Sequence, residues 1–199
     1  MAKGNLIVLS GPSGAGKSTV VGKAMQKRAD MCFSISVTTR SPRPNEVDGK
    51  DYYFIDQQRF DEMVENGELL EHAVYVSNSY GTPRRYVEDQ IAAGMNVILD
   101  IEVQGASQVH ANAPEATMIF LVPPSLEELE RRLRARGTET DEKIEARLAR
   151  ARQEYASADI YEYIIVNDDA DEAAEELLAI LKAESCRYEA RKGYLAAES

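Results

Sequence analysis

The sequence predicts an α/β fold in which a parallel sheet is covered by helices. This fold class rests on three observations in the sequence. Four short apolar runs are present, helical patterns lie between them, and two stretches break this alternation. Continuous apolar runs are typical of strands buried on both faces, as in parallel sheets. The expected strands are Asn5–Ser10, Asn96–Ile101, Thr117–Val122 and Tyr163–Asn167.

The segments between these runs repeat apolar residues at helical spacing. The clearest case has Ser125 and Glu128 at capping-box spacing and ends at Gly137, which favours a helix stop. Strands that alternate with such helices are joined by right-handed crossovers. The expected helices are Lys17–Arg28, Ser125–Arg136, Thr140–Tyr155 and Asp171–Glu184.

Two insertions interrupt the alternation within what we expect to be one domain over residues 1–199. The first, about residues 34–88, mixes β-branched and aromatic residues with prolines and a glycine, which predicts short antiparallel strands and turns. The second, about residues 125–157, is an arginine-rich helical pair. The core then comprises about residues 1–33, 89–124 and 158–199.

Composition limits the class of protein. Of 199 residues, 44% are hydrophobic and 29% charged, which is typical of a soluble globular domain and excludes disordered and fibrous classes. No apolar run approaches the roughly 18 residues of a membrane span, and the first residues lack a signal-peptide pattern, so we expect a cytoplasmic protein without a membrane partner. Cys32 and Cys186 are too few for a disulfide framework or a zinc site. We expect both to be packed thiols, and any metal to arrive with a substrate.

Charge argues against general nucleic-acid binding. The chain has 23 Lys and Arg against 34 Asp and Glu, a net charge of −11, so most of its surface would repel a polyanion. Two stretches are nevertheless basic, residues 1–45 and 131–152. The first of them contains a phosphate-binding motif.

Residues 11–18 read GPSGAGKS and match the P-loop pattern G-x-x-x-x-G-K-[ST] between an expected strand and an expected helix. Backbone N–H groups of such a loop surround a β-phosphate, aided by the helix N-terminus. We expect Lys17 to bridge the β- and γ-phosphates, Ser18 to be a Mg²⁺ ligand and Thr19 to make a weaker phosphate contact. The full expected nucleotide-contact set is Gly11, Pro12, Ser13, Gly14, Ala15, Gly16, Lys17, Ser18 and Thr19.

A phosphate loop by itself leaves three classes open: a switch GTPase, a motor or helicase ATPase, and a small-molecule kinase. A GTPase needs an N-K-x-D segment to read its base, and Asn167-Asp168-Asp169 lacks the lysine. Remodelling ATPases are usually larger. The two insertions favour a kinase with a second binding site.

Several further motifs resemble those of the guanylate kinase family, bacterial type, in order and spacing over about residues 4–184. They are SVTTRSPRP at 36–44, EVDGKDY at 46–52, Tyr80-Gly81, DIEVQG at 100–105, RGTE at 136–139 and VNDD at 166–169. The resemblance implies the fold of a P-loop nucleoside monophosphate kinase with a parallel core sheet, a mixed-β GMP-binding insertion and a helical lid. It also implies the reaction ATP + GMP = ADP + GDP, with MgATP and GMP as partners.

The resemblance also implies which residues hold GMP. Arg40 and Arg43, stiffened by neighbouring prolines, can present two guanidinium forks to the GMP phosphate. Tyr52 and Tyr80 would donate hydroxyl groups to the same phosphate, and Arg147 would join them from the lid.

Guanine presents two donors on one edge, and a carboxylate accepts both, so Glu71 is the expected base reader. Ser36 and Thr82 would reach O6 or the amino group. Asp100 follows a strand and could orient metal-bound water, contact guanine, or do both. Glu102 is a less certain contact.

Positioned arginines can neutralise the charge that develops during phosphoryl transfer. Arg136 and Arg147 are the expected transition-state contacts. Arg131 either stacks on adenine or faces water. The other lid arginines, Arg132, Arg134, Arg150 and Arg152, are expected to pair with nearby glutamates.

Two rival functions remain at this point: a kinase for another phosphorylated metabolite on the same scaffold, and a non-catalytic guanylate-kinase-like binding module. The intact Gly16-Lys17-Ser18 and the arginine pair argue against the module. We expect a monomer or a small homo-oligomer. Asn45 occupies a position where the family commonly has glycine, and asparagine tolerates a positive φ there.

Overall fold

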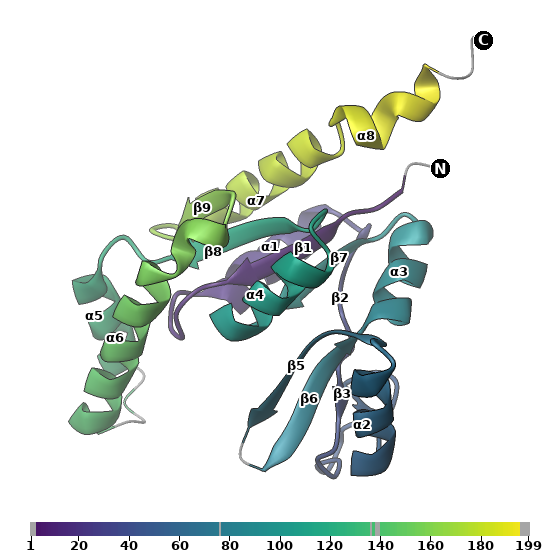
Figure 1. Ribbon diagram of the computed structural model, residues 1–199. Coiled ribbons are helices and arrows are strands. Elements are labelled where there is room, and N and C mark those ends of the chain that lie inside the picture. Colours follow the sequence, from purple (N-terminus) through teal and green to yellow (C-terminus); the bar gives the residue numbers. More distant parts are fainter. Residues whose placement is uncertain (1–2, 76, 136, 138–139, 196–199) are drawn as a thin grey trace.

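The computed structural model describes residues 3–75, 77–135, 137 and 140–195. A five-stranded sheet, with all strands parallel and in the order β2-β7-β1-β8-β9, forms the core (Figure 1). This confirms the expected α/β class. Its strands are β1 (Leu6–Ser10), β2 (Met31–Phe33), β7 (Asn96–Asp100), β8 (Thr117–Val122) and β9 (Tyr163–Val166).

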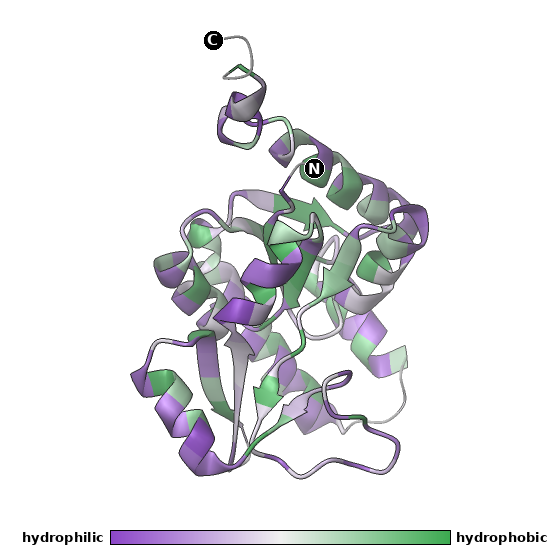
Figure 2. Cartoon of the chain, turned by 90° about the vertical axis from the view of Figure 1, so that its right-hand side faces the viewer, coloured by the Kyte–Doolittle hydropathy of each residue, from purple (hydrophilic) through white to green (hydrophobic). Residues whose placement is uncertain are grey.

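Helices cover both faces of this sheet. Ile7 and Leu9 of β1 pack with α1 (Lys17–Lys27) and α7 (Ala170–Glu184), whereas Val8 lies in the opposite cluster with α4 (Val103–Asn112). Side chains alternate along a strand, so neighbouring residues of β1 enter different layers. In Figure 2 the core strands are mostly hydrophobic, and the outer helix faces carry hydrophilic residues.

A second sheet forms a separate lobe, with strand order β4-β3-β6-β5. Parallel pairing of β3 with β4 and antiparallel pairing of the others make it mixed, as the resemblance implies, whereas the residue pattern alone predicted only antiparallel strands. Helix α2 packs on it through Phe60 and Met63. The elements are β3 (Val37–Thr38), β4 (Tyr53–Phe54), α2 (Gln57–Glu65), β5 (Leu69–Tyr75) and β6 (Asn78–Pro83).

Helix α3 (Arg84–Ala92) follows this lobe and returns the chain to the core sheet, where Val87 is buried. The second insertion, the expected lid, contains α5 (Leu126–Ala135) and α6 (Asp141–Ala156), which share a small apolar cluster that includes Leu129, Leu133 and Leu148. Within the described residues there are also three short helices: η1 (Ala158–Ile160) between α6 and β9, and α8 (Tyr188–Arg191) and η2 (Lys192–Tyr194) after α7.

Two details bear on the sequence-based expectations. Asn45 has φ 74°, in the left-handed region that asparagine tolerates. Cys32 is half-buried, but Cys186 is exposed, so the expectation of a packed thiol was wrong for Cys186, which follows α7 on the surface. Among the described residues, no helix is both long enough and apolar enough to cross a membrane.

Candidate active site

The phosphate loop runs from the end of β1 into α1, and glycine is required at several points. Gly11, Gly14 and Gly16 have φ of 144°, 105° and 98°. A Cβ on Gly11 would lie 2.0 Å from the Leu121 carbonyl oxygen, and one on Gly16 would lie 2.3 Å from Nδ2 of Asn167. Only glycine fits these backbone conformations and approaches. Ser13, Ser18 and Thr19 are exposed at the loop, whereas Ala15 is fully buried beneath it.

Lys17 begins α1 and folds back over the loop. Its Nζ donates to the Gly11 carbonyl at 2.8 Å and lies 3.7 Å from Oδ1 of Asp100. Leu9 of β1 is in register with Asp100 of β7, so the parallel pairing brings the aspartate beside the loop. Desolvation raises the pKa of Asp100, and the Lys17 ammonium partly opposes this. The lysine therefore favours the charged form of this carboxylate, against the effect of burial.

Glu71 is a buried carboxylate on β5, at the side of the second lobe that meets the core. Thr82 on the neighbouring strand β6 donates its hydroxyl to Oε1 of Glu71 at 2.7 Å. Burial raises the pKa of Glu71, while the hydrogen bond from Thr82 opposes the shift. A Cβ on Gly105 of α4 would lie 3.0 Å from Oε2 of Glu71, so α4 backs the carboxylate closely. The expected pair of Glu71 and Thr82 is thus in contact.

The segment from Asp100 to Gly105 joins these two groups of residues. Asp100 faces Lys17 at its start, and Gly105 lies against Glu71 at its end. Ser36, at the start of the second lobe, is half-buried immediately before β3. The loop lysine and the buried carboxylate therefore flank a single short segment at the carboxyl end of β7, where ligands bind in open parallel sheets.

Arg40 lies beside both expected tyrosines. Its guanidinium lies 5.5 Å from the ring centre of Tyr52, whose ring is 6.2 Å from that of Tyr80. A bidentate ion pair joins Arg40 to Glu46, at 2.9 and 3.0 Å. Glu46 also accepts from the backbone N–H of Arg43 at 2.7 Å.

We did not identify Glu46 as a partner of Arg40 from the sequence. The acid lies six residues after the arginine, and only the turn through Asn45, with its positive φ, brings the carboxylate back. The carboxylate of Glu46 therefore orients the Arg40 guanidinium in the structure itself. Arg43 itself is exposed.

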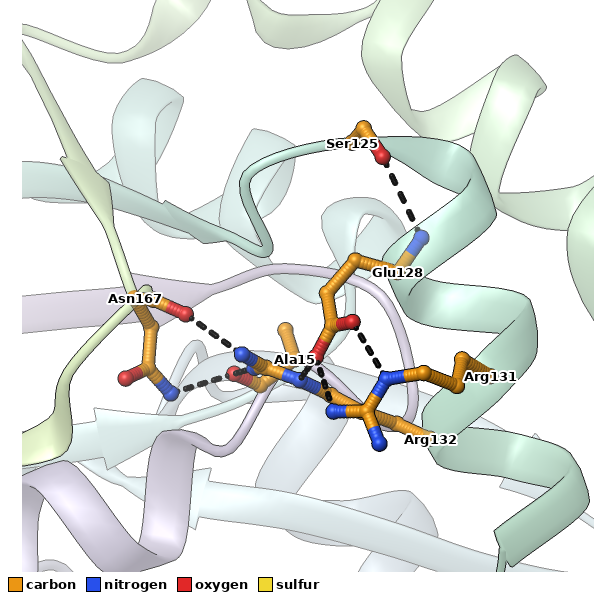
Figure 3. A network of polar contacts seen from close by, with 6 residues as sticks. All are labelled: Ala15, Ser125, Glu128, Arg131, Arg132 and Asn167. Carbon is orange, nitrogen blue, oxygen red and sulfur yellow. Dashed lines mark hydrogen bonds and ion pairs between the residues drawn. The ribbon is translucent and has the colours of Figure 1, made fainter.

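Lid arginines reach the phosphate loop from two helices. Nη1 of Arg147 on α6 donates to Oγ of Ser13 at 2.8 Å. Arg132 on α5 donates to the Asn167 carbonyl oxygen at 2.9 Å and to Glu128 at 2.7 Å (Figure 3). The sequence predicted the glutamate pair of Arg132 but missed its contact with residue 167, because 35 residues separate the two. Arg136, the other expected transition-state contact, lies outside the described residues.

Arg131, Arg134 and Arg150 form ion pairs along or beside their helices. The expected glutamate pair of Arg152 was wrong: among the described residues no carboxylate lies within ion-pair distance of it, although hydrogen bonds and, to a lesser degree, the charge of Arg152 lower the pKa of Glu127. Arg131 pairs with Glu128 and its side chain is exposed, which favours the interpretation that it faces water. Arg134 pairs with Glu130 and Asp141. Arg150 pairs with Glu154 and also with Glu102 of the core at 2.6 Å. Glu102, whose role the sequence left open, therefore contacts Arg150 of α6 in this structure.

Comparison with known proteins identifies the family to which this sequence and fold are similar. The model of the family described as guanylate kinase matches residues 3–184. A guanylate kinase of Oceanobacillus iheyensis is 49% identical over 94% of this chain and 91% of its own. Another, from Thermobifida fusca, is 51% identical over 90% and 92%. The crystal structure of guanylate kinase from Anaplasma phagocytophilum superposes with a TM-score of 0.70 at 38% identity, covering 94% of this chain and 89% of that one.

Proposed function

This chain belongs to the guanylate kinase family, and from that premise we propose that it transfers the γ-phosphoryl group of ATP to GMP, giving ADP and GDP. One observation carries the proposal: the segment from Asp100 to Gly105 touches Lys17 of the phosphate loop and the buried Glu71 of the second lobe. A donor nucleotide on the loop and an acceptor base at Glu71 would then share one site.

ATP binds in this proposal with its phosphates on the loop. Backbone N–H groups of residues 11–18 and the N-terminus of α1 favour the negative charge. Lys17, already held by the Gly11 carbonyl, would exchange that contact for β- and γ-phosphate oxygens. Arg147 is directed at the loop through Ser13 and would add positive charge there, as would Arg136.

Mg²⁺ fits the residues beside the loop. Hard oxygen donors suit this ion, and it usually takes only one or two protein ligands besides phosphate oxygens and water. No group of three or more His, Cys, Asp or Glu in the described part of the chain could hold a metal by itself. The Ser18 hydroxyl would be a ligand of the ion, and Asp100, which faces Lys17, would orient its bound water. Bound there with ATP, it would supply charge neutralisation at the phosphates.

GMP binds in the second lobe. Arg40 and Arg43 would hold its phosphate together with the Tyr52 and Tyr80 hydroxyl groups, and Glu46 would keep the Arg40 fork oriented. Glu71 would accept from both guanine donors, and Ser36 and Thr82 would complete the contacts with the base. The acceptor phosphate is already anionic, so positioning and charge neutralisation suffice without a general base.

The three parts would act together. We propose that the core holds ATP, that the insertion at about residues 34–88 holds GMP, and that the lid at about residues 125–157 closes over both. Closure would exclude water, which otherwise competes for the γ-phosphate.

A coupled assay of ADP release with GMP, AMP, UMP and CMP in turn tests the function. We expect rapid release with GMP and far slower release with the other three. Preference for a different acceptor would favour a kinase for another metabolite on this scaffold. ADP release with none of the four would favour a non-catalytic binding module.

A further inference from the structure

Glu128 in the first turn of α5 holds two arginines with one carboxylate (Figure 3). Arg131 donates to both oxygens, at 2.6 and 2.7 Å, and Nε of Arg132 donates to Oε1 at 2.7 Å. The two arginines differ in exposure: the Arg131 side chain is 71% exposed and that of Arg132 is 21%. Only the second points inward.

The far end of Arg132 reaches the wall of the phosphate loop. Nη2 donates to the Asn167 carbonyl oxygen at 2.9 Å, and Nη1 lies 3.5 Å from the Ala15 carbonyl oxygen. Asn167 is 4% exposed and donates its own Nδ2 to the Ala15 oxygen at 2.7 Å. The same amide nitrogen fills the space that a side chain on Gly16 would need. A continuous set of polar contacts therefore runs from Glu128 to the backbone of the loop.

Glu128 also suits a constant structural role. Hydrogen bonds from both arginines lower its pKa to about 2, so the carboxylate stays charged at every pH at which the protein would work. An arginine side chain loses rotamer entropy when it is ordered, and a fixed partner prepares its planar fork for a second contact.

We propose that Glu128 is a positioning residue for the donor nucleotide: it aims Arg132 at Asn167 and the Ala15 carbonyl, and so holds the phosphate loop in its binding shape from α5. This rests on the proposed function, in which the loop binds ATP. Glu128 itself contacts no substrate. Its loss should therefore weaken ADP and ATP binding and leave GMP binding unchanged.

Calorimetric titration with MgADP tests this without requiring phosphoryl transfer. We expect Glu128→Ala to raise the Kd for ADP by about 3- to 10-fold, the range that loss of a charged hydrogen bond produces in a partly exposed site. Glu128→Gln, which keeps one acceptor oxygen, should have a smaller effect in the same direction. The Kd for GMP should stay within about twofold of the parent in both variants.

Arg131→Gln is the matched control, because Arg131 pairs with the same carboxylate but points outward. We expect it to leave the Kd for ADP within about twofold. Arg132→Gln should weaken ADP binding as Glu128→Ala does. The double variant with Glu128→Ala and Arg132→Gln should bind ADP no more weakly than either single variant, because both changes break the same set of contacts.

Equal ADP binding in the parent and in Glu128→Ala would overturn the proposal, and so would a loss in Arg131→Gln as large as that in Glu128→Ala. A loss of GMP binding equal to the loss of ADP binding would also overturn it, because it would indicate a general structural defect. These results are distinguishable from failure of the proposed function, in which the parent binds ADP normally but does not phosphorylate GMP.

Discussion

At the scale of single residues, Lys17 places a positive charge at the phosphate loop. It contacts the Gly11 carbonyl and faces Asp100, and neither contact is needed to fold α1, whose buried face is formed by Val20, Val21 and Ala24. We therefore predict that Lys17→Ala folds normally but loses at least about a hundredfold in kcat, because the lost charge acts mainly in the transition state. Steady-state kinetics with GMP and MgATP measure this, and a kcat within tenfold of the parent would contradict it.

Glu71 should determine the choice of base. Adenine has an unprotonated ring nitrogen and no amino group at the corresponding edge, so a buried carboxylate would face a lone pair. Sites built on such hydrogen bonds discriminate by roughly 10⁴ to 10⁵. In Glu71→Gln one acceptor becomes a donor, so we predict that kcat/KM for GMP falls at least about tenfold while the value for AMP stays level or rises. An unchanged GMP/AMP ratio would shift base reading to Ser36, Thr82 or Asp100.

The same variant should be more stable without ligand at neutral pH. Burial raises the folded-state pKa of Glu71 above the ordinary 4.5. The contribution of this group to stability is therefore greatest below about pH 4.5 and is lost as the pH rises through the folded-state pKa. Glutamine does not titrate and can still accept from Thr82. Urea denaturation at pH 7 should therefore show a higher midpoint for Glu71→Gln than for the parent, with the difference shrinking toward pH 4.5. A lower midpoint at pH 7 would contradict the assigned cost of burying this carboxylate.

At the scale of elements, the lid helix α5 packs directly on the phosphate loop. Leu133 is 1% exposed, and a Cβ on Gly14 would lie 3.0 Å from its Cδ2 atom. Its other neighbours are Ile144 and Leu148 of α6, in a cluster too small to absorb a cavity easily. We predict that Leu133→Ala lowers the free energy of unfolding by about 2 to 5 kcal/mol and also weakens ADP binding. The partly buried Leu126→Ala should cost less, and equal losses in the two variants by urea denaturation would count against this packing.

Elements with their own periodic signal could be predicted from the sequence. β1, β7, β8 and β9 are continuous apolar runs, and the structure has a strand at each of them. The expected burial on both faces was wrong for β9, because it lies at the edge of the sheet and exposes Ile164 and Val166. β2 has only three residues and owes its place to pairing with β7, so its sequence carries no local signal. In α2 the buried residues are only Phe60 and Met63, too few to show a repeat.

Among the site residues, those in a local motif could likewise be predicted from the sequence, and those that depend on distant contacts could not. The phosphate loop is a contiguous motif, so its position and its glycines follow from the sequence. The contacts of Arg40 with Glu46, and of Arg132 with Asn167, depend on a turn and on packing between distant segments. Such pairs have no signature in one sequence, because charged residues this common could pair in many ways.

At the scale of the whole molecule, the second lobe is attached to the core along one edge. Gln108 of α4 exchanges two hydrogen bonds with the backbone of His72 on β5, and Asn112 donates to the Leu70 carbonyl. β4 lies at the opposite edge of that sheet, and the arginines that would bind the GMP phosphate follow its neighbour β3. Figure 1 shows this lobe projecting from the core beside α4. This arrangement would let the lobe turn about β5, so that the edge with β4 and the expected phosphate-binding arginines approaches the loop.

This geometry predicts that both substrates together close the molecule. Phosphoryl transfer needs reacting atoms about 3 to 3.5 Å apart, so the GMP phosphate held by Arg40 must approach the nucleotide on the loop. Small-angle X-ray scattering should show a smaller radius of gyration with MgADP and GMP together than with either alone, nearer the roughly 16 Å of a compact chain of this length. Arg40→Lys keeps the charge but loses the fork, so it should require about tenfold more GMP for the same compaction. Arg59→Lys serves as the control, because Arg59 on α2 pairs with Glu62 and Glu68 away from the site. An unchanged radius in the presence of both ligands would mean that the lobes are already closed, and the hinge at β5 would then have no role in the reaction.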